Sequence, residues 1–215
     1  MNLPTKLTVL RLIMIPAFVA LYLIEFPFHD VIATGIFLLA SFTDFLDGYI
    51  ARKYNMVTDL GKFLDPVADK VLVMSALVLL SVEFMNFSNS VLGIVFDGVI
   101  GILIVVSTII ILAREFIITG FRTIAAKKNL VLAADKIGKM KTVMQMISII
   151  ALLLTNFAFS LYTAPKEGSY AQFPMFGVIV LMIGLVALVF AVFLTVLSAV
   201  NYIVKNRSVL KEDNK

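Results

Sequence analysis

The chain contains no cysteine and no tryptophan, and it has a single histidine, His29. Without cysteine there is no disulfide framework, no thiolate metal site and no cysteine nucleophile. Any metal site must therefore use oxygen ligands or His29 alone. Without tryptophan, only tyrosine and phenylalanine remain as aromatic anchors at a membrane interface.

Charged residues are also scarce. Only 15% of the 215 residues are charged, 61% are apolar, and the mean hydropathy is +1.04. Soluble domains contain about 45–50% apolar and about 25% charged residues. A globule of this length has too little interior to bury the surplus, so apolar side chains must face lipid. The composition excludes a water-soluble domain and predicts a membrane protein.

Apolar runs of about 20 residues, the length of a transmembrane helix, occur six times. They lie near 7–26, 31–51, 66–84, 91–113, 143–162 and 174–204. The sequence therefore predicts an all-α, polytopic membrane protein with six transmembrane helices in one domain, residues 1–204, followed by a solvated tail, 205–215. No small-residue cleavage site follows the first run, which favours a retained span over a signal peptide.

Lysine and arginine predict the orientation. Of the 18 basic residues, 17 fall on one side of the six predicted spans, and only Lys166 falls on the other. Positive residues collect on the cytoplasmic side, so both termini are expected in the cytoplasm. No nucleic-acid motif accompanies these charges, and we expect no nucleic-acid partner. The helix-friendly stretch 114–142 predicts that the fourth helix continues beyond the membrane and turns back near Asn129.

Four aspartates occur in two pairs at helical spacing. Asp44 and Asp47 are three residues apart near the end of the second predicted span, and Asp65 and Asp69 are four apart at the start of the third. Each pair therefore lies on one helix face. Two antiparallel neighbours would bring the four carboxylates to one membrane depth. The alternative, in which Asp44 and Asp47 end a helix and pair with Arg52 or Lys53, explains only one pair.

Four adjacent carboxylates near a membrane repel one another unless protons or cations neutralise them. Oxygen ligands without histidine or cysteine favour hard ions, so we expect Mg²⁺ or Mn²⁺. Two such ions can hold the attacking and leaving oxygens of a phosphoryl transfer. Gly48, Ala51 and Gly61 leave room for a large phosphorylated ligand. Pro66 predicts that the third helix starts, or is kinked, at the site.

The segment DFLDGYIARKYNMVTDLGKFLDPVADK resembles the CDP-alcohol phosphotransferase family. The family pattern D-x2-D-G-x2-A-R-x8-G-x3-D-x3-D is matched throughout by Asp44, Asp47, Gly48, Ala51, Arg52, Gly61, Asp65 and Asp69. The resemblance implies a homodimeric integral membrane enzyme in which an alcohol displaces CMP from a CDP-linked lipid.

The resemblance also implies residue roles. Asp44, Asp47 and Asp65 would hold one ion, and Asp44, Asp65 and Asp69 the second. Asp69 would be the general base, a role that the spacing alone does not assign to Asp69 over Asp47. The CDP group would be bound by Asp47, Gly48, Ala51, Arg52 and Gly61.

Further segments resemble the phosphatidylglycerophosphate synthase branch of this family: NLPTKLTVLR at 2–11, AREF at 113–116, Arg122, Ala125–Ala126 and GKMKTVMQ at 138–145. This resemblance implies transfer from CDP-diacylglycerol to sn-glycerol 3-phosphate. A doubly charged acceptor calls for cations, and the candidates are Arg114, Arg122, Lys139 and Lys141. Arg122 and Lys139 are the first choices, with Arg114 paired to Glu115 or Asp135 or also contacting phosphate.

Thr8 and Arg11 form a weaker candidate pair for phosphate contact. Arg11 lies at membrane depth, where an unpaired guanidinium is costly, so its expected partner is a phosphate or an aspartate. His29 is expected to be a solvated loop residue beside Asp30. No binding site is predicted on that side of the membrane.

Several alternatives share these features. Within the family, the acceptor could be phosphatidylglycerol, as in cardiolipin formation, serine or an inositol phosphate. Outside it, intramembrane carboxylates also occur in cation-coupled transporters, and aspartate-rich Mg²⁺ sites occur in intramembrane prenyl transferases. Against a transporter, the aspartates lie at one membrane face and no pair of broken helices is visible. We expect a bacterial plasma membrane, with the active site on the cytoplasmic side.

Overall fold

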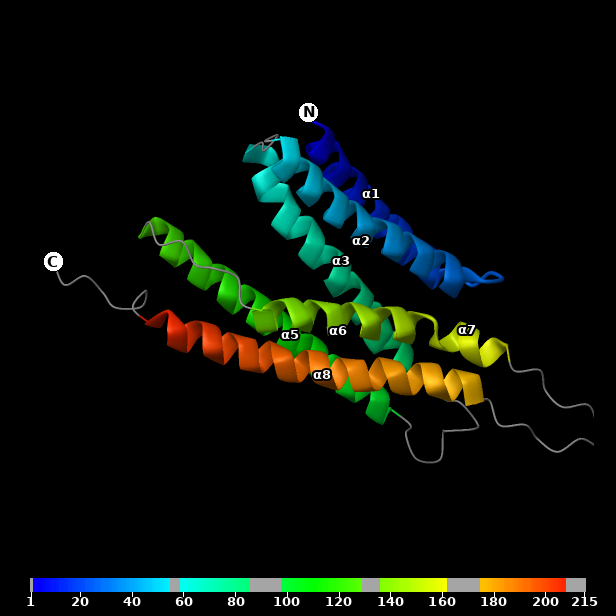
Figure 1. Cartoon of the computed structure of the whole chain (residues 1–215). Coiled ribbons are helices and arrows are strands. Elements are labelled where there is room, and N and C mark those ends of the chain that lie inside the picture. Colours follow the sequence, from blue (N-terminus) through cyan, green and yellow to red (C-terminus); the bar gives the residue numbers. More distant parts are fainter. Residues whose placement is uncertain (1, 55–58, 86–97, 129–135, 162–174, 208–215) are drawn as a thin grey trace, which may run out of the picture. The chain divides into compact units, whose positions relative to one another are not determined.

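The computed structural model describes residues 2–54, 59–85, 98–128, 136–161 and 175–207, and the regular structure in these ranges is entirely helical (Figure 1). The helices are α1 (Leu3–Leu23), α2 (His29–Tyr54), α3 (Asp59–Met85), α5 (Val99–Lys127), α6 (Lys136–Leu153), α7 (Thr155–Ser160) and α8 (Met175–Lys205). The predicted all-α class is confirmed.

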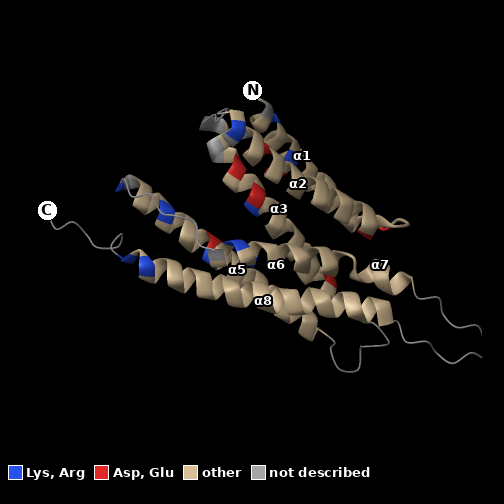
Figure 2. Cartoon of the chain, viewed as in Figure 1, with Lys and Arg blue, Asp and Glu red and all other residues tan. Residues whose placement is uncertain are grey.

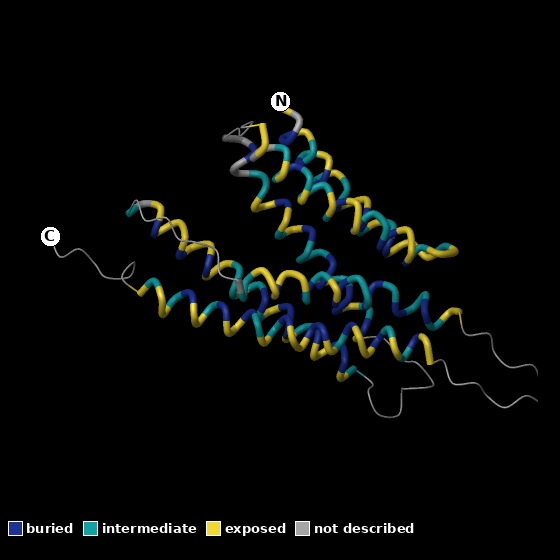
Figure 3. The backbone as a smooth tube through the Cα atoms, viewed as in Figure 1, coloured by how far each residue is buried: buried dark blue, intermediate teal, exposed yellow. Residues whose placement is uncertain are grey.

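Four of the described helical segments are long and apolar enough to cross a membrane: Pro4–Leu23, His29–Ile50, Val99–Ala126 and Met175–Lys205. Many of their large apolar residues are exposed, as expected for lipid contact. Figure 3 shows exposed residues in yellow along these helices. The charged side chains Asp65, Asp69 and Lys70 interrupt the apolar character of α3, and α6 begins with three lysines within six residues. Spans at these two positions stay a prediction.

The structure corrects the predicted helix boundaries in two places and agrees with them in another. Pro66 lies inside α3, which begins at Asp59, so the third helix does not start at the aspartates. The fourth helix does continue past residue 113, because α5 runs to Lys127. The expected turn at Asn129 lies outside the described residues. The fifth apolar run is divided at Leu154, between α6 and α7.

The chain forms two compact units, one from residues 1–83 and 153–180 and the other from residues 84–152 and 181–215. In the first, α1 packs on α2 through fully buried aromatic side chains. The ring centroids of Phe18 and Phe37 are 5.6 Å apart. Ala33 and Ala40 on α2 are also fully buried, and small side chains at these positions let the two backbones approach.

The buried stripes of α1 and α2 both lead to polar residues. On α2, Ala33, Phe37 and Ala40 follow helical spacing, and the same spacing continues to Asp44 and Asp47. On α1, a single buried face contains Thr5, Thr8, Arg11, Ile15, Phe18 and Tyr22. The packing that joins these helices therefore also aligns Thr8 and Arg11 with the aspartates.

In the second unit, α5, α6 and α8 pack closely. Ile118, Phe121 and Ala125 of α5 form a buried cluster with Tyr202 of α8. The Ser148 hydroxyl of α6 donates a 2.9 Å hydrogen bond to the carbonyl of Gly184. A Cβ atom at Gly184 would lie 2.8 Å from the Leu152 side chain, so only glycine permits this approach of α8 to α6.

Candidate active site

Four acidic residues of the first unit lie on α2 and α3 at the end where the N-terminus lies (Figure 2). Asp44 and Asp47 belong to the last three turns of α2, and Asp65 and Asp69 to the first three turns of α3. In the two helices the spacing places each pair on one face, as the sequence predicts.

Arg11 joins the two aspartates of α2. Its Nη1 lies 2.5 Å from Asp44 Oδ1 and its Nη2 lies 2.5 Å from Asp47 Oδ2. The Arg11 side chain is fully buried, Asp47 is 4% exposed and Asp44 is 43% exposed. The planar guanidinium offers its donors in a fixed fork, which suits two carboxylates at once. Of the two partners that the sequence left open for Arg11, a phosphate or an aspartate, the structure shows an aspartate.

Thr8 connects α2 to α3. Its Oγ1 lies 2.6 Å from Asp65 Oδ1 and 3.5 Å from Asp47 Oδ2. The single hydroxyl proton serves one acceptor at a time, and the shorter distance favours Asp65. Two residues of α1, one turn apart, therefore bring together three of the four predicted metal ligands. Asp69 lies one turn beyond Asp65 on α3 and is exposed.

The donor set fits a divalent metal by its chemistry. Asp44, Asp47 and Asp65 supply only oxygen atoms, the ligands that Mg²⁺ and Mn²⁺ prefer. The contacts of these aspartates with Arg11 and Thr8 each use one carboxylate oxygen. A carboxylate has a second oxygen, which can serve as a metal ligand. Across the described ranges no three acidic or histidine side chains are already arranged to hold an ion. Between Asp44 and Asp47 the positive charge comes from the guanidinium of Arg11.

The predicted CDP-binding positions are on the same two helices. Gly48 is half-buried in α2 and Gly61 is buried in α3. Ala51 and Arg52 belong to α2, but their side chains lie outside what the structure describes. Lys53 Nζ lies 5.6 Å from the ring centroids of both Tyr49 and Tyr54. Because Arg11 is the ion-pair partner of Asp44 and Asp47, Lys53 is not needed to neutralise them.

The predicted acceptor cations belong to the second unit, and two of them are held by an acid. Arg114 Nη1 lies 3.1 Å from Glu115 Oε1, and its Nη2 donates a 3.0 Å hydrogen bond to Ser198 Oγ. Lys141 is buried and forms an ion pair with the same Glu115 oxygen. The predicted pairing of Arg114 with Glu115 is confirmed, while Asp135 lies outside the described residues.

The other two cations are exposed. Arg122 Nε donates a 3.2 Å hydrogen bond to the hydroxyl of Tyr202, and the guanidinium lies 5.5 Å from that ring centroid. Lys139 is exposed near the start of α6. Ser198 and Tyr202 were not expected as partners of these cations. Their spacing of four residues places two polar groups on one face of the mostly apolar α8, which is the sequence feature that could have indicated them.

A protein of Bacillus subtilis (strain 168) named CDP-diacylglycerol–glycerol-3-phosphate 3-phosphatidyltransferase is 37% identical over 99% of each chain. A protein of the same name from Rickettsia typhi is 35% identical over 94% of each chain. A cardiolipin synthase (CMP-forming) of Oryza sativa subsp. japonica is 40% identical over 73% of this chain and 46% of its own length.

The model of one protein family, CDP-alcohol phosphatidyltransferase, matches residues 1–204. That range contains the eight residues of the aspartate pattern, the α1 residues that bind them and the cations of α5 and α6. With near full-length relatives above 30% identity, the assignment does not depend on the short pattern alone. The chain belongs to the CDP-alcohol phosphatidyltransferase family.

Proposed function

We propose that the protein transfers the phosphatidyl group of CDP-diacylglycerol to sn-glycerol 3-phosphate, giving phosphatidylglycerophosphate and CMP. The observation that carries the proposal is the similarity, over 99% of both chains, to the Bacillus subtilis protein with that name. The cations of α5 and α6 add support, because a phosphate-bearing acceptor needs positive partners.

The proposed metal ligands are Asp44, Asp47 and Asp65 for one Mg²⁺ or Mn²⁺ ion, and Asp44, Asp65 and Asp69 for a second. When bound, such ions neutralise the charge of a pyrophosphate and of its leaving phosphate. Asp47, Gly48, Ala51, Arg52 and Gly61 form the proposed CDP-binding surface. Gly48 and Gly61 support it because they carry no side chain that would block the ligand from the backbone.

Asp69 is the proposed general base. It accepts the proton of the attacking glycerol hydroxyl while that oxygen bonds to the phosphorus of the phosphatidyl group. The bond from this phosphorus to the bridging oxygen of CMP breaks, and CMP leaves with the electron pair. The exposure of Asp69 supports this role, because an exposed carboxylate is available to an incoming alcohol.

Arg11 and Thr8 keep the carboxylates together before substrate arrives. Without a cation, Asp44 and Asp47 would repel one another at a low-dielectric membrane boundary. The Arg11 guanidinium removes that repulsion through its two ion pairs. If Mg²⁺ or Mn²⁺ bound to the carboxylates, Arg11 and Thr8 would be released from them. Both side chains could then donate hydrogen bonds to a substrate phosphate.

Arg122 and Lys139 are the proposed primary contacts of the acceptor phosphate, because both are exposed. Arg114 and Lys141 belong to the same proposed acceptor site. Since Glu115 already pairs with both, their main contribution is to maintain a positive field on α5 and α6.

The proposed topology has six spans in a catalytic domain of residues 1–204, with the tail 205–215 and both termini in the cytoplasm. The active site then faces the cytoplasm of a bacterial plasma membrane, and the enzyme is a homodimer. Because the chain has no cysteine, single cysteines at Lys6, Lys166 and Lys211 can be labelled in intact cells. Only the one at Lys166 should react with a membrane-impermeant reagent, whereas labelling at all three would contradict this topology.

A second candidate acceptor is phosphatidylglycerol, which would make the product cardiolipin. The similarity to the rice cardiolipin synthase favours it, but this relative matches over 73% of the chain against 99% for the Bacillus subtilis protein. The free phosphate of glycerol 3-phosphate also accounts for the exposed cations, whereas phosphatidylglycerol has only a diester.

The deciding experiment measures CMP release from CDP-diacylglycerol by the purified protein with three acceptors: sn-glycerol 3-phosphate, phosphatidylglycerol and glycerol. Release that depends on glycerol 3-phosphate and stops in excess chelator is the expected result. The Asp69→Asn variant is the matched control for contaminating activity. Release that depends on phosphatidylglycerol instead would replace the proposed acceptor and leave the family assignment intact.

A further inference from the structure

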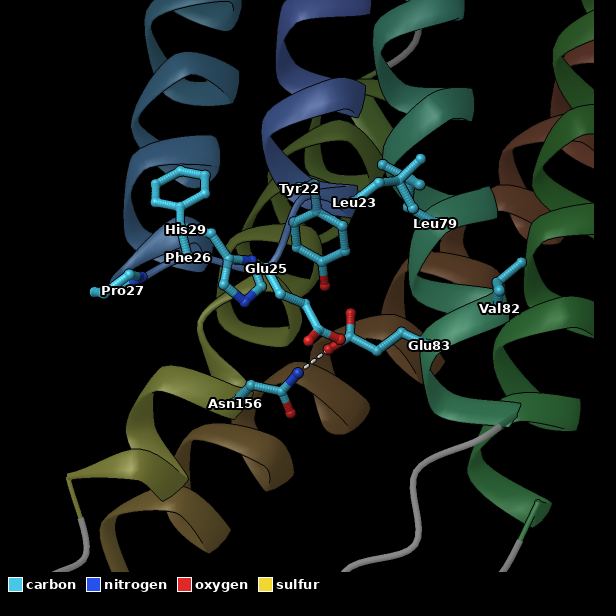
Figure 4. Close-up of a pocket in the computed structure, with 10 residues that line it drawn as sticks. All are labelled: Tyr22, Leu23, Glu25, Phe26, Pro27, His29, Leu79, Val82, Glu83 and Asn156. Atoms are coloured by element: carbon cyan, nitrogen blue, oxygen red, sulfur yellow. Dashed lines mark hydrogen bonds between the residues drawn. The ribbon is translucent and has the colours of Figure 1, made fainter.

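A cavity of about 540 Å³ lies in the first unit, away from the aspartates (Figure 4). It is bounded by the end of α1, the connection to α2, the last turns of α3, and α7. Tyr22 follows Arg11 by eleven residues on α1, which corresponds to about 16 Å along the helix. The polar and aromatic residues that line the cavity are Tyr22, Glu25, Phe26, His29, Glu83 and Asn156.

Three buried polar atoms of the lining residues have no hydrogen-bond partner among the described residues: the hydroxyl of Tyr22, Oε2 of Glu83 and Nδ1 of His29, which lies 3.2 Å from Asp30 Oδ1. Tyr22 is only 7% exposed. The other oxygen of Glu83, Oε1, accepts a hydrogen bond from the amide of Asn156. Figure 4 shows the Tyr22 hydroxyl and the carboxyl groups of Glu25 and Glu83 pointing toward one another. Buried polar groups normally have partners, so this arrangement points to a ligand.

The wall formed by the α1–α2 connection is held in an unusual conformation. Phe28 has a φ of 65°, a backbone conformation that is uncommon for residues other than glycine. Its ring lies 6.1 Å from that of Phe157 on α7. His29, predicted as a solvated loop residue, is instead the first residue of α2 and is 25% exposed. The turn therefore fixes Phe26 and His29 as aromatic walls of the cavity.

We propose that this cavity binds the primary ammonium group of an organic amine. Glu25, Glu83 and the Tyr22 hydroxyl supply acceptors for its three N–H donors, and Phe26 supplies an aromatic face that attracts a cation. No lysine or arginine is among the described lining residues. A bare metal ion fits less well, because only two of the described lining residues, Glu25 and Glu83, are acidic. The volume is also far larger than an ion needs.

The amine can come from a small molecule in solution or from the headgroup of an aminophospholipid, and two experimental arms distinguish these sources. In the first, the purified protein in detergent is heated with increasing ethylammonium chloride, with tetramethylammonium chloride as the control for ionic strength. In the second, it is heated in nanodiscs of phosphatidylcholine with and without phosphatidylethanolamine. A ligand that binds only the folded state raises the unfolding temperature.

The expected result is a rise with the primary amine in at least one arm. Tyr22→Phe and Glu83→Gln should each weaken this response about tenfold or more, since each loses a hydrogen bond to a charged group. Tyr54→Phe, which removes an exposed hydroxyl outside the cavity, is the matched control and should respond as wild type does. If Glu83→Gln does not fold, the response of Tyr22→Phe alone tests whether the amine binds in this cavity.

The proposal is overturned if neither arm raises the unfolding temperature, if tetramethylammonium acts as strongly as ethylammonium, or if Tyr22→Phe responds like wild type. CMP release is measured in parallel and should stay within about twofold of wild type in all three variants, because none of these residues belongs to the proposed active site. A failed amine response with normal CMP release therefore rejects this site and leaves the proposed reaction standing.

Discussion

The two charged regions of this protein are built in opposite ways. In the first unit, one buried cation, Arg11, joins Asp44 and Asp47. In the second, one partly buried acid, Glu115, joins Arg114 and Lys141. Each region uses a single opposite charge to hold like charges together near a low-dielectric medium, where their repulsion is strong. The acidic region thus holds the proposed metal ligands together, and the basic region holds the proposed phosphate partners together.

The two regions should also differ in how strongly the loss of one charged residue affects the reaction. Metal ligands must act together, so the loss of one carboxylate should stop the reaction. Cations that bind a phosphate each contribute separately to the binding free energy, so the loss of one should weaken binding without stopping turnover.

Asp44→Asn should abolish CMP release, because Asp44 is proposed to contact both ions and an amide supplies no negative charge. The measurement is CMP release at saturating Mg²⁺ or Mn²⁺, alongside wild type in excess chelator. Asp30→Asn, on the same helix but far from the site, is the control. Full wild-type activity in chelator would contradict the two-metal proposal.

Asp69→Asn should lower kcat by about 10²–10⁴-fold, the range expected for loss of a general base. CDP-diacylglycerol binding should weaken much less, since Asp44, Asp47 and Asp65 are unchanged. Single-turnover kinetics at several pH values separate the chemical step from binding. Near-normal turnover would move the role of base to Asp47 or to a water molecule.

Arg11→Ala should destabilise the metal-free protein by about 3–5 kcal/mol, since it leaves the buried carboxylate of Asp47 without its partner. Saturating Mg²⁺ should recover part of this loss, because the ion supplies the missing positive charge. Thermal unfolding in chelator and in Mg²⁺ measures both effects, with Lys6→Ala as the control. Equal destabilisation in the two conditions would mean that Arg11 and the metal do not share these ligands.

Arg122→Ala and Lys139→Ala should each raise the KM for glycerol 3-phosphate by roughly 10-fold to 150-fold, the equivalent of a charge-assisted hydrogen bond. The KM for CDP-diacylglycerol should change little. Lys205→Ala, an exposed cation at the end of α8, is the control. If both KM values rise together, or if glycerol serves as well as glycerol 3-phosphate, these residues only orient the protein in the membrane.

Tyr202→Phe should have the smallest effect, a rise of a few-fold in the KM for glycerol 3-phosphate. The variant removes the hydroxyl that accepts the hydrogen bond from Arg122 Nε, worth about 0.5–1.5 kcal/mol, but keeps the ring under the guanidinium. In an Arg122→Ala background the same change should have no effect on KM. An additive effect there would show that Tyr202 does not act through Arg122.

The sequence by itself determined the helical class and the approximate positions of the four long apolar helices that the structure describes, because lipid requires long runs of apolar residues and leaves few alternatives. It also determined the pairing of the aspartates on helix faces, since spacings of three and four residues have one geometric meaning in a helix. The extension of α5 to Lys127 followed from the same local rules, which also gave Glu115 as one of the candidate partners of Arg114.

Contacts between helices were decided only by the tertiary structure. The sequence left open whether Arg11 meets a phosphate or an aspartate, because the choice depends on the register of α1 against α2. It gave no sign that Tyr202 would lie under Arg122, or that Tyr22, Glu25 and Glu83 would face one cavity. These side chains are far apart in sequence. What brings them together is the close packing of small and aromatic residues, and helical periodicity does not encode which face meets which neighbour.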